Sequence, residues 1–500
     1  MLSLPRSPAS PIFPRLLFGW NNLLRPLLPS FVADCVFPDY AQTWSLHPTS
    51  YLDGLRGIAS IIVFFCHYTE ENFSALTPSY GIDEDTPSGW IQLPYLRIIF
   101  SGRPMVHVFF VISGFVLSYK PIKAIHARDL DKCYTTLASS TFRRAFRLFG
   151  PCIVSTAMVM YLYQNGYIED IDPLAPTTWS EQFWRWKGAV FHQITWPWSW
   201  DSDLRPAYDI HLWTIPIEFV HSMLLFMVIL MLSRVRLRIR QGVVFGLMGY
   251  CLACGKWAAF EFLSGLFFAE IHVLQQAQAK MWESSELDSH YSQKRDSGSN
   301  SKMLHIAIVM MGLFIAGWPN FEADRTPGIR YFLDHTPLPF AKMDELAPQK
   351  FWFGLSAVFM VWSIGELPLL KGFFEGPLAQ YCGRISYAVY ICHGPMLLLF
   401  QDAVLGKSDA PAKGERGTPE FKPAVVGWGV KGHLGIANTT QITTSWLVGL
   451  FIIGPMVIWA ADVFWRAVDN PVVSLGKKLE NACLDDTEPS PRSLGYSSVV

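Results

Sequence analysis

Long apolar runs separated by polar loops recur along the chain from residue 52 to residue 468. A bilayer core about 30 Å thick requires about 20 apolar residues in each crossing helix. With their flanking residues, ten runs meet this length: 52–68, 105–119, 149–167, 211–232, 243–258, 259–274, 303–319, 351–370, 385–405 and 444–468. The apolar stretch 243–274 exceeds one ordinary span, so we expect two helices with a tight turn near Lys256. The pattern predicts an all-α integral membrane protein, a polytopic bundle of about ten transmembrane helices.

Polar segments divide the chain around this membrane domain. We expect residues 1–48 to be a cytosolic or interfacial lead-in, 49–475 to be the membrane domain, and 476–500 to be a polar tail. A polar linker, 275–302, interrupts the membrane domain on its cytosolic side. Hydrophobic residues make up 51% of the chain and charged residues only 16%, too little charge to cover a soluble protein of 500 residues. The net charge of −1 offers no basic surface for nucleic acid.

The loop charges predict which side of the membrane each loop faces. With a cytosolic start, the inner loops carry 17 Lys and Arg residues and the outer loops carry 14, although the outer loops are nearly twice as long in total. Basic residues concentrate in cytosolic loops, so this difference favours the assumed orientation. The N-glycosylation sequons at Asn72 and Asn438 both fall in predicted outer loops. We expect a multi-pass protein of the endoplasmic reticulum or another endomembrane.

Arg56 and His67 stand out among the ionisable residues of the predicted spans. They are eleven residues apart on one helix, so their side chains point within about 20° of each other and lie about 16 Å apart along the axis. The alignment of the two side chains on one helix face suits a long substrate with an anionic head at Arg56 and a reactive end at His67. The imidazole of His67 can accept a proton near neutral pH. The alternative is a snorkelling Arg56 and a buried His67 satisfied by a neighbouring helix. Spacing leaves both interpretations open.

Other charged residues also have two interpretations. Glu218 follows Pro216 in LWTIPIEF, and its carboxylate could orient an imidazole or pair with an arginine of another helix. The arginines of RRAFR, which are Arg143, Arg144 and Arg147, could bind phosphate or act as cytosolic topology anchors.

A third group of charged residues is expected to have no special role. Glu270, Glu366, Asp462 and Arg466 lie near predicted helix ends, where snorkelling explains them. Glu261 falls at the expected turn and is uninformative there.

Aromatic residues crowd the predicted outer segment 179–213. Tryptophans at this level usually form an interfacial belt, but Trp196, Trp198 and Trp200 could also form a platform for an apolar acceptor. Cys251 and Cys254 form a CxxC pair inside an apolar run without His or Cys partners nearby, so we expect no metal site.

Six motifs, in order, resemble landmarks of the membrane-bound acyltransferase-3 family, and the second of them has a form typical of fungal members. They are YLDGLRGIASIIVFFCHY, SGRPMVHVFFVISGFVLSYK, RRAFRLFGP, HLWTIPIEF, FLSGLFFAE and GRISYAVYICHGP. The resemblance runs from about residue 50 to 470. Two positions depart from the family pattern: His107 replaces a small or aliphatic residue, and Asp469-Asn470-Pro471 replaces a Glu followed two residues later by Pro.

The resemblance implies an enzyme that moves an acyl group, usually acetyl, from cytosolic acyl-CoA to a hydroxyl group. It implies that His67 is catalytic, and that Glu218 and His393 have catalytic or supporting roles. It makes Arg56, Arg143, Arg144 and Arg147 candidates for binding the CoA phosphates, and we connect His107 with acceptor specificity. The expected partners are acyl-CoA as co-substrate, a small and apolar hydroxyl acceptor such as a terpenoid or polyketide, and the bilayer; no permanently bound cofactor is expected. The alternatives are a transporter or exporter of an acylated metabolite or lipid without transferase activity, and a catalytically silent family member that serves as a scaffold.

Overall fold

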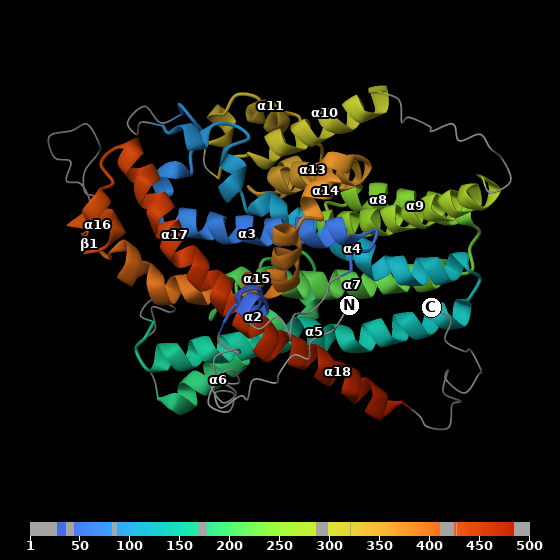
Figure 1. Ribbon diagram of the computed structural model, residues 1–500, viewed down its shortest axis with the longest axis horizontal. Helices are drawn as coiled ribbons and strands as arrows, with labels where there is room; N and C mark the ends of the chain where they lie inside the picture. Colours follow the sequence, from blue (N-terminus) through green and yellow to red (C-terminus); the bar gives the residue numbers. More distant parts are fainter. Residues whose placement is uncertain are drawn as a thin grey trace, which may run out of the picture.

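The computed structural model describes residues 28–36, 45–82, 88–168, 178–286, 299–320, 322–410, 425–426 and 428–484. Long helices dominate it, and in Figure 1 α3, α4, α5, α7 and α9 run side by side across the picture. The short elements α16 and β1 lie at its left, α6 at its lower left and α11 at its top, and the end of α9 reaches its right edge. Among the described residues, the strands are β1 (Ser408–Ala410) and β2 (Val425–Val426), which pair antiparallel.

Ten long helices coincide with the ten predicted segments. They are α3 (Ser50–Asn72), α4 (Arg103–His126), α5 (Leu130–Gln164), α7 (Thr214–Leu232), α8 (Leu237–Ala253), α9 (Trp257–Glu286), α10 (Ser299–Ala316), α13 (Ala347–Glu366), α15 (Pro377–Leu405) and α17 (Thr439–Phe464). Gly255, with φ +71°, forms the turn between α8 and α9, so the expected break near Lys256 is confirmed.

The remaining helical elements are short. They are α2 (Ser30–Val36), η3 (Ser74–Leu76), η4 (Trp90–Gln92), η5 (Arg97–Phe100), α6 (Trp179–Ala189), the π-helical turn η6 (Val190–Ile194), η7 (Pro197–Ser199), η8 (Ile210–Trp213), η9 (Ala323–Arg325), α11 (Ile329–Asp334), α12 (Phe340–Met343), α14 (Pro368–Phe374), α16 (Val430–Leu434), the π-helical turn η10 (Trp465–Asp469) and α18 (Asn470–Cys483).

Six spans of the described chain are long and apolar enough to cross a membrane, and a seventh results if α13 and α14, bent by 98°, are one span. The six contain α4, α5, α7, α9, α15 and α17. The other predicted spans depart from the simple pattern, since α3 carries four charged residues, α8 has only 17 residues, and α10 is apolar over Ser301–Ala316. These helices are consistent with a polytopic membrane bundle, and the number ten stays a prediction.

Two helix pairs cross closely through glycines. A Cβ added to Gly57 of α3 would lie 2.2 Å from the backbone N of Gly383 on α15. In the second pair, a Cβ added to Gly114 of α4 would lie 2.3 Å from the carbonyl O of Phe262 on α9. Small residues let membrane helices approach to backbone contact, where van der Waals packing holds them. The α3–α15 contact matters for function because it fixes the two helices that carry His67 and His393.

Alanine at Gly57 is expected to destabilise the protein. The new Cβ would force α3 and α15 apart, and overpacking of this kind costs about 1–3 kcal/mol. The detergent-solubilised variant should therefore unfold at a lower temperature than the wild type. The matched control is Gly246→Ala in α8, where a Cβ meets nothing within 4 Å, and its midpoint should stay equal or rise. Equal losses in both variants would contradict the close α3–α15 crossing.

Two carboxylates that we expected to snorkel are buried ion-pair partners, so that expectation is wrong for them. Glu270 is buried and accepts hydrogen bonds from Arg240, with His126 Nε2 3.0 Å away. Asp462 is fully buried and lies 2.8 Å from Arg466 Nε. A carboxylate that is buried inside the helix bundle, away from water, requires such partners. Glu366, by contrast, is exposed at the end of α13.

Asp462 also attaches the described N-terminal helix to the bundle. The hydroxyl and backbone N–H of Ser30, at the start of α2, donate to its carboxylate at 2.6 and 3.0 Å. Tyr381 of α15 donates to the same carboxylate at 2.9 Å. One buried acid therefore joins α2, α15 and α17.

Candidate active site

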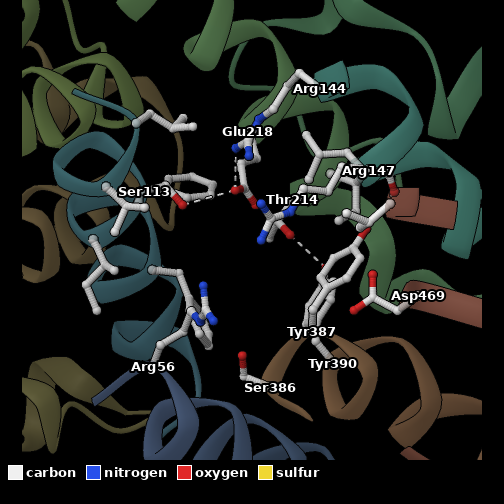
Figure 2. A pocket seen from close by; sticks show the side chains of 18 of the residues that line it. Arg56, Ser113, Arg144, Arg147, Thr214, Glu218, Ser386, Tyr387, Tyr390 and Asp469 are labelled. Carbon is white, nitrogen blue, oxygen red and sulfur yellow. Dashed lines mark hydrogen bonds and ion pairs between the residues drawn. The ribbon is translucent and has the colours of Figure 1, made fainter. Parts of the chain in front are cut away.

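A cavity of about 290 Å³ lies among α3, α4, α5, α7, α15 and η10 (Figure 2). We call it the arginine pocket. Its polar lining consists of Arg56, Ser113, Arg144, Arg147, Thr214, Glu218, Arg384, Ser386, Tyr387, Tyr390, Asp469 and Asn470. Apolar side chains such as Phe110 and Leu117 form much of the remaining wall. A pocket with this lining suits a ligand with an anionic part and a long uncharged part.

Glu218 organises one side of the arginine pocket. Its carboxylate accepts a hydrogen bond from Arg144 Nη2 at 2.7 Å and from the Ser113 hydroxyl at 3.0 Å. The Nε of Arg144 donates to Ser222 at 3.0 Å, so the buried guanidinium is held from two sides. Of the two roles predicted for Glu218, orienting an imidazole or pairing with an arginine of another helix, the structure shows the second. Its carboxylate orients the guanidinium of Arg144.

The other arginines of the candidate set take different places. Arg56 donates to the carbonyl of Gly383 at 3.2 Å, and its Nε is buried without a hydrogen-bond partner among the described residues. Arg147 is exposed and lines the pocket beside Tyr387 and Asp469 (Figure 2). Arg143 does not line the pocket, and its Nε lies 3.0 Å from a carboxylate oxygen of Glu480 on α18. The structure therefore brings Arg56, Arg144 and Arg147 together and leaves Arg143 outside.

Three histidines gather beside Tyr390, one of the residues that line this pocket. The ring centroid of His67 lies 4.1 Å from that of His211 and 5.3 Å from that of His393, and those of His211 and His393 are 4.7 Å apart. We call His67, His211 and His393 the histidine cluster. The His67 side chain is 27% exposed and that of His211 only 7%, while His393 is fully buried. His67 is therefore the member that an incoming molecule reaches.

Acidic residues surround the cluster. Asp209 accepts from His211 twice, from the backbone N–H at 3.1 Å and from Nδ1 at 2.8 Å. Glu71 of α3 lies 3.5 Å from Nε2 of His211, and Glu70 lies 3.9 Å from Nδ1 of His67. His393 Nδ1 lies 3.2 Å from the carbonyl of Val389. Asp209 thus fixes the ring of His211 and the Val389 carbonyl that of His393, whereas the carboxylate near His67 is too far away for a hydrogen bond.

Tyr390 joins the arginine pocket to the histidine cluster. Its side chain lines the pocket, and its hydroxyl donates to the backbone carbonyl of His211 and contacts the Thr214 hydroxyl at 2.7 Å. Its ring centroid lies 6.1 Å from that of His393. The histidine cluster therefore lies next to a wall residue of the arginine pocket, and Arg56 and His67 belong to the same helix, α3.

His107 lies apart from both sites. It is buried on α4, with Nδ1 2.6 Å from Glu261, and its ring packs near Trp257 and Phe353. Glu261 is fully buried in the first turns of α9, so treating it as an uninformative turn residue is wrong. The His107–Glu261 pair fills the α4–α9 contact and does not line the arginine pocket.

The predicted outer residues lie near the surface. Trp198 and Trp200 are exposed and Trp196 is half-buried, and none of them lines the arginine pocket. Asn72 is half-buried and donates to Gln401 Oε1 at 2.9 Å. Asn438 is exposed and caps α17 by accepting from the backbone N–H of Gln441. Glycosylation at both sequons stays a prediction.

Sequence reasoning missed His211, Asp209 and Glu71. A signal for the first two existed, because an Asp and a His two residues apart directly precede an apolar helix. No comparable signal marks Glu71. It lies near His211 because η8 packs against the end of α3 in the folded protein.

Residues 49–466 match a family of acyltransferase domains, the acyltransferase-3 family. The chain belongs to this family. It is similar to the O-acetyltransferase PaAT-1 of Phomopsis amygdali, with 31% identity over 70% of this chain and 73% of the relative. It is also similar to the acyltransferase R4 of a Phoma species, with 26% identity over 76% and 89% of the two chains. The acyltransferase clz18 of Cochliobolus lunatus is 23% identical over 87% and 95%. No solved structure matches the chain.

Membership of the family establishes that this chain is an acyltransferase, and it favours the enzyme over the transporter considered above. The arginine pocket and the histidine cluster both lie within the matched residues.

Proposed function

We propose that this acyltransferase moves an acetyl group from cytosolic acetyl-CoA to a hydroxyl of a small, apolar acceptor of fungal secondary metabolism, such as a terpenoid or polyketide alcohol. One observation carries the proposal: Tyr390, which lines the pocket together with Arg56, Arg144 and Arg147, also contacts the histidine cluster. The name of the Phomopsis amygdali relative supports both a hydroxyl acceptor and an acetyl group.

In this proposal, the CoA phosphates bind at the arginine end of the pocket. Guanidinium groups suit phosphate because they bind it with two parallel hydrogen bonds. Arg147 is exposed there, whereas Arg144 is already held by Glu218 and supplies charge from a fixed position. The uncharged pantetheine arm would then follow the pocket towards Tyr390 and bring the thioester to the histidine cluster.

His67 is the base in the proposed reaction. Its ring is partly exposed and lies 3.9 Å from the nearest carboxylate, so it is free to accept the proton of an acceptor hydroxyl. The acceptor's apolar character is supported by a groove of about 330 Å³ on the helix of His67, between α3 and α17. Phe64, Phe65 and Trp446 line this groove, and its surface is almost entirely apolar.

Untargeted mass spectrometry of the native host tests the function without a guess about the acceptor. Deleting the protein should remove a product that is heavier by one acetyl unit than a compound that accumulates instead. Membranes that contain the protein should convert that compound when given radiolabelled acetyl-CoA, and membranes without it should not. If no such pair exists and a metabolite changes only its distribution across the membrane, the transporter replaces this proposal.

A further inference from the structure

We propose that His211, oriented by Asp209, is a second catalytic residue that donates a hydrogen bond to the thioester carbonyl oxygen while His67 acts as the base. This inference rests on the proposed acetyl transfer and adds the group that stabilises its negative charge. Fixed donors aimed at the oxygen where charge develops commonly provide one of the largest contributions to catalysis.

The surroundings of His211 favour a ring that carries protons on both nitrogens. Nδ1 lies 2.8 Å from Asp209, and Nε2 lies 3.5 Å from Glu71, so each nitrogen faces a carboxylate. The other groups that face the ring are His67 on α3 and His393 on α15. A carboxylate at each nitrogen stabilises the imidazolium form of His211. Both nitrogens of an imidazolium carry a proton, so this ring has no lone pair for a metal ion, although the nitrogen atoms of the cluster lie within 4.8 Å of one another.

The position of His211 is fixed from several sides. Asp209 holds both its backbone N–H and its ring, and Tyr390 donates to its backbone carbonyl. The absence of a side chain at Gly394 makes room for the Asp209–His211 pair. A Cβ at this position would lie 2.5 Å from His211 Nδ1 and 2.9 Å from Asp209 Oδ1. A donor held this firmly requires little rearrangement when charge appears on a substrate oxygen.

We assign the hydrogen bond to the substrate to Nε2 of His211. This atom is buried and makes no hydrogen bond with the described residues, despite its distance of 3.5 Å from Glu71. The ring that carries it contacts the ring of His67, with the two centroids 4.1 Å apart. A thioester carbonyl placed against these two touching rings would meet the base and this N–H side by side.

The reaction balances with these two histidines. His67 takes the proton of the acceptor hydroxyl, and the oxygen forms a bond to the thioester carbon. The carbonyl electron pair moves to its oxygen, which accepts a hydrogen bond from His211. When the tetrahedral intermediate collapses, the C–S bond breaks and the CoA thiolate takes the proton from His67. The products are the acetyl ester and CoA, and both histidines return to their starting states.

Steady-state kinetics of purified His211→Gln and Asp209→Asn variants test this assignment, with radiolabelled acetyl-CoA as donor and the compound isolated from the host as acceptor. We expect kcat to fall about 10²–10³-fold for His211→Gln and at least about 10-fold for Asp209→Asn. The KM values for acetyl-CoA and acceptor should stay within about twofold, because neither residue binds the CoA phosphates. A loss of folded protein would also lower the apparent kcat at unchanged KM, so each rate is divided by the amount of folded protein measured by size-exclusion chromatography.

Two further variants separate a catalytic role from a structural one. Gly394→Ala keeps every functional group and displaces only the pair of Asp209 and His211, so it should also lower kcat. The control is His221→Gln, since His221 is equally buried but contacts Asp201 and the carbonyl of Ile217 outside the cluster. Its kcat should equal that of the wild type.

Three outcomes would overturn the assignment while leaving the transferase intact. One is an unchanged kcat in His211→Gln, and another is an equal loss of kcat in the His221→Gln control. The third is loss of wild-type activity to a chelator with recovery on addition of Zn²⁺, which would make the cluster a metal site. A wild type that transfers no acetyl group would instead reject the proposed function and this inference with it.

Discussion

Replacement of His67 by alanine is expected to abolish acetyl transfer while the protein remains folded and able to bind its donor. Loss of a general base typically lowers a rate about 10²–10⁴-fold, and no other member of the cluster is placed to substitute. His393 is fully buried, and both nitrogens of His211 face carboxylates. Transfer of radiolabel from acetyl-CoA to the acceptor, at matched protein levels, measures the loss.

His67→Gln is the packing control for this prediction, because glutamine fills much of the space but cannot act as a base at neutral pH. Both variants should lose activity and retain a donor KM or binding constant close to that of the wild type. His67 touches the other histidine rings and not the arginine end of the pocket. Measurable turnover in either variant above one hundredth of the wild-type rate would reject His67 as the base.

Arg147→Ala is expected to raise the KM for acetyl-CoA about 10- to 100-fold with a much smaller change in kcat. A hydrogen bond to a charged group contributes about 1.5–3 kcal/mol, which corresponds to this range. Arg147 is exposed at the pocket wall, so its removal should not destabilise the protein. Initial rates over a range of acetyl-CoA concentrations provide the measurement.

Arg143→Ala is the matched control, four residues away on the same helix. Arg143 points to Glu480 and does not line the pocket, so its loss should leave the KM for acetyl-CoA unchanged. If both variants raise KM equally, the effect comes from the positive charge of the cytosolic helix end and not from a phosphate site. If neither does, these arginines are topology anchors, and the donor binds elsewhere.

Some of these features were visible in the sequence because they depend on short-range regularities. The ten apolar segments coincide with ten helices, since the length and apolarity of a segment determine whether it can exist as a helix in lipid. The shared face of Arg56 and His67 follows from helical geometry alone. The break at Gly255 follows from a length limit and a residue that readily adopts positive φ.

The partners of the buried charges could not be read in the same way. Glu218 pairs with Arg144, 74 positions earlier, and Glu261 pairs with His107, 154 positions earlier. Nothing in the local pattern of either glutamate distinguishes a snorkelling side chain from one buried in an ion pair. Only the packing of α4 against α9, and of α5 against α7, decides which carboxylate finds a cation.

The sequence by itself determined an all-helical chain with the composition of a membrane protein, the motifs of its family and the alignment of Arg56 with His67. The tertiary structure decided that Arg143 leaves the pocket, that Glu218 serves an arginine, and that His211 joins His67 and His393. The physical reason is the range of the forces involved. Hydrophobic burial and helical hydrogen bonds act within one segment, whereas a site built from α3, η8 and α15 exists only when close helix packing brings three distant segments together.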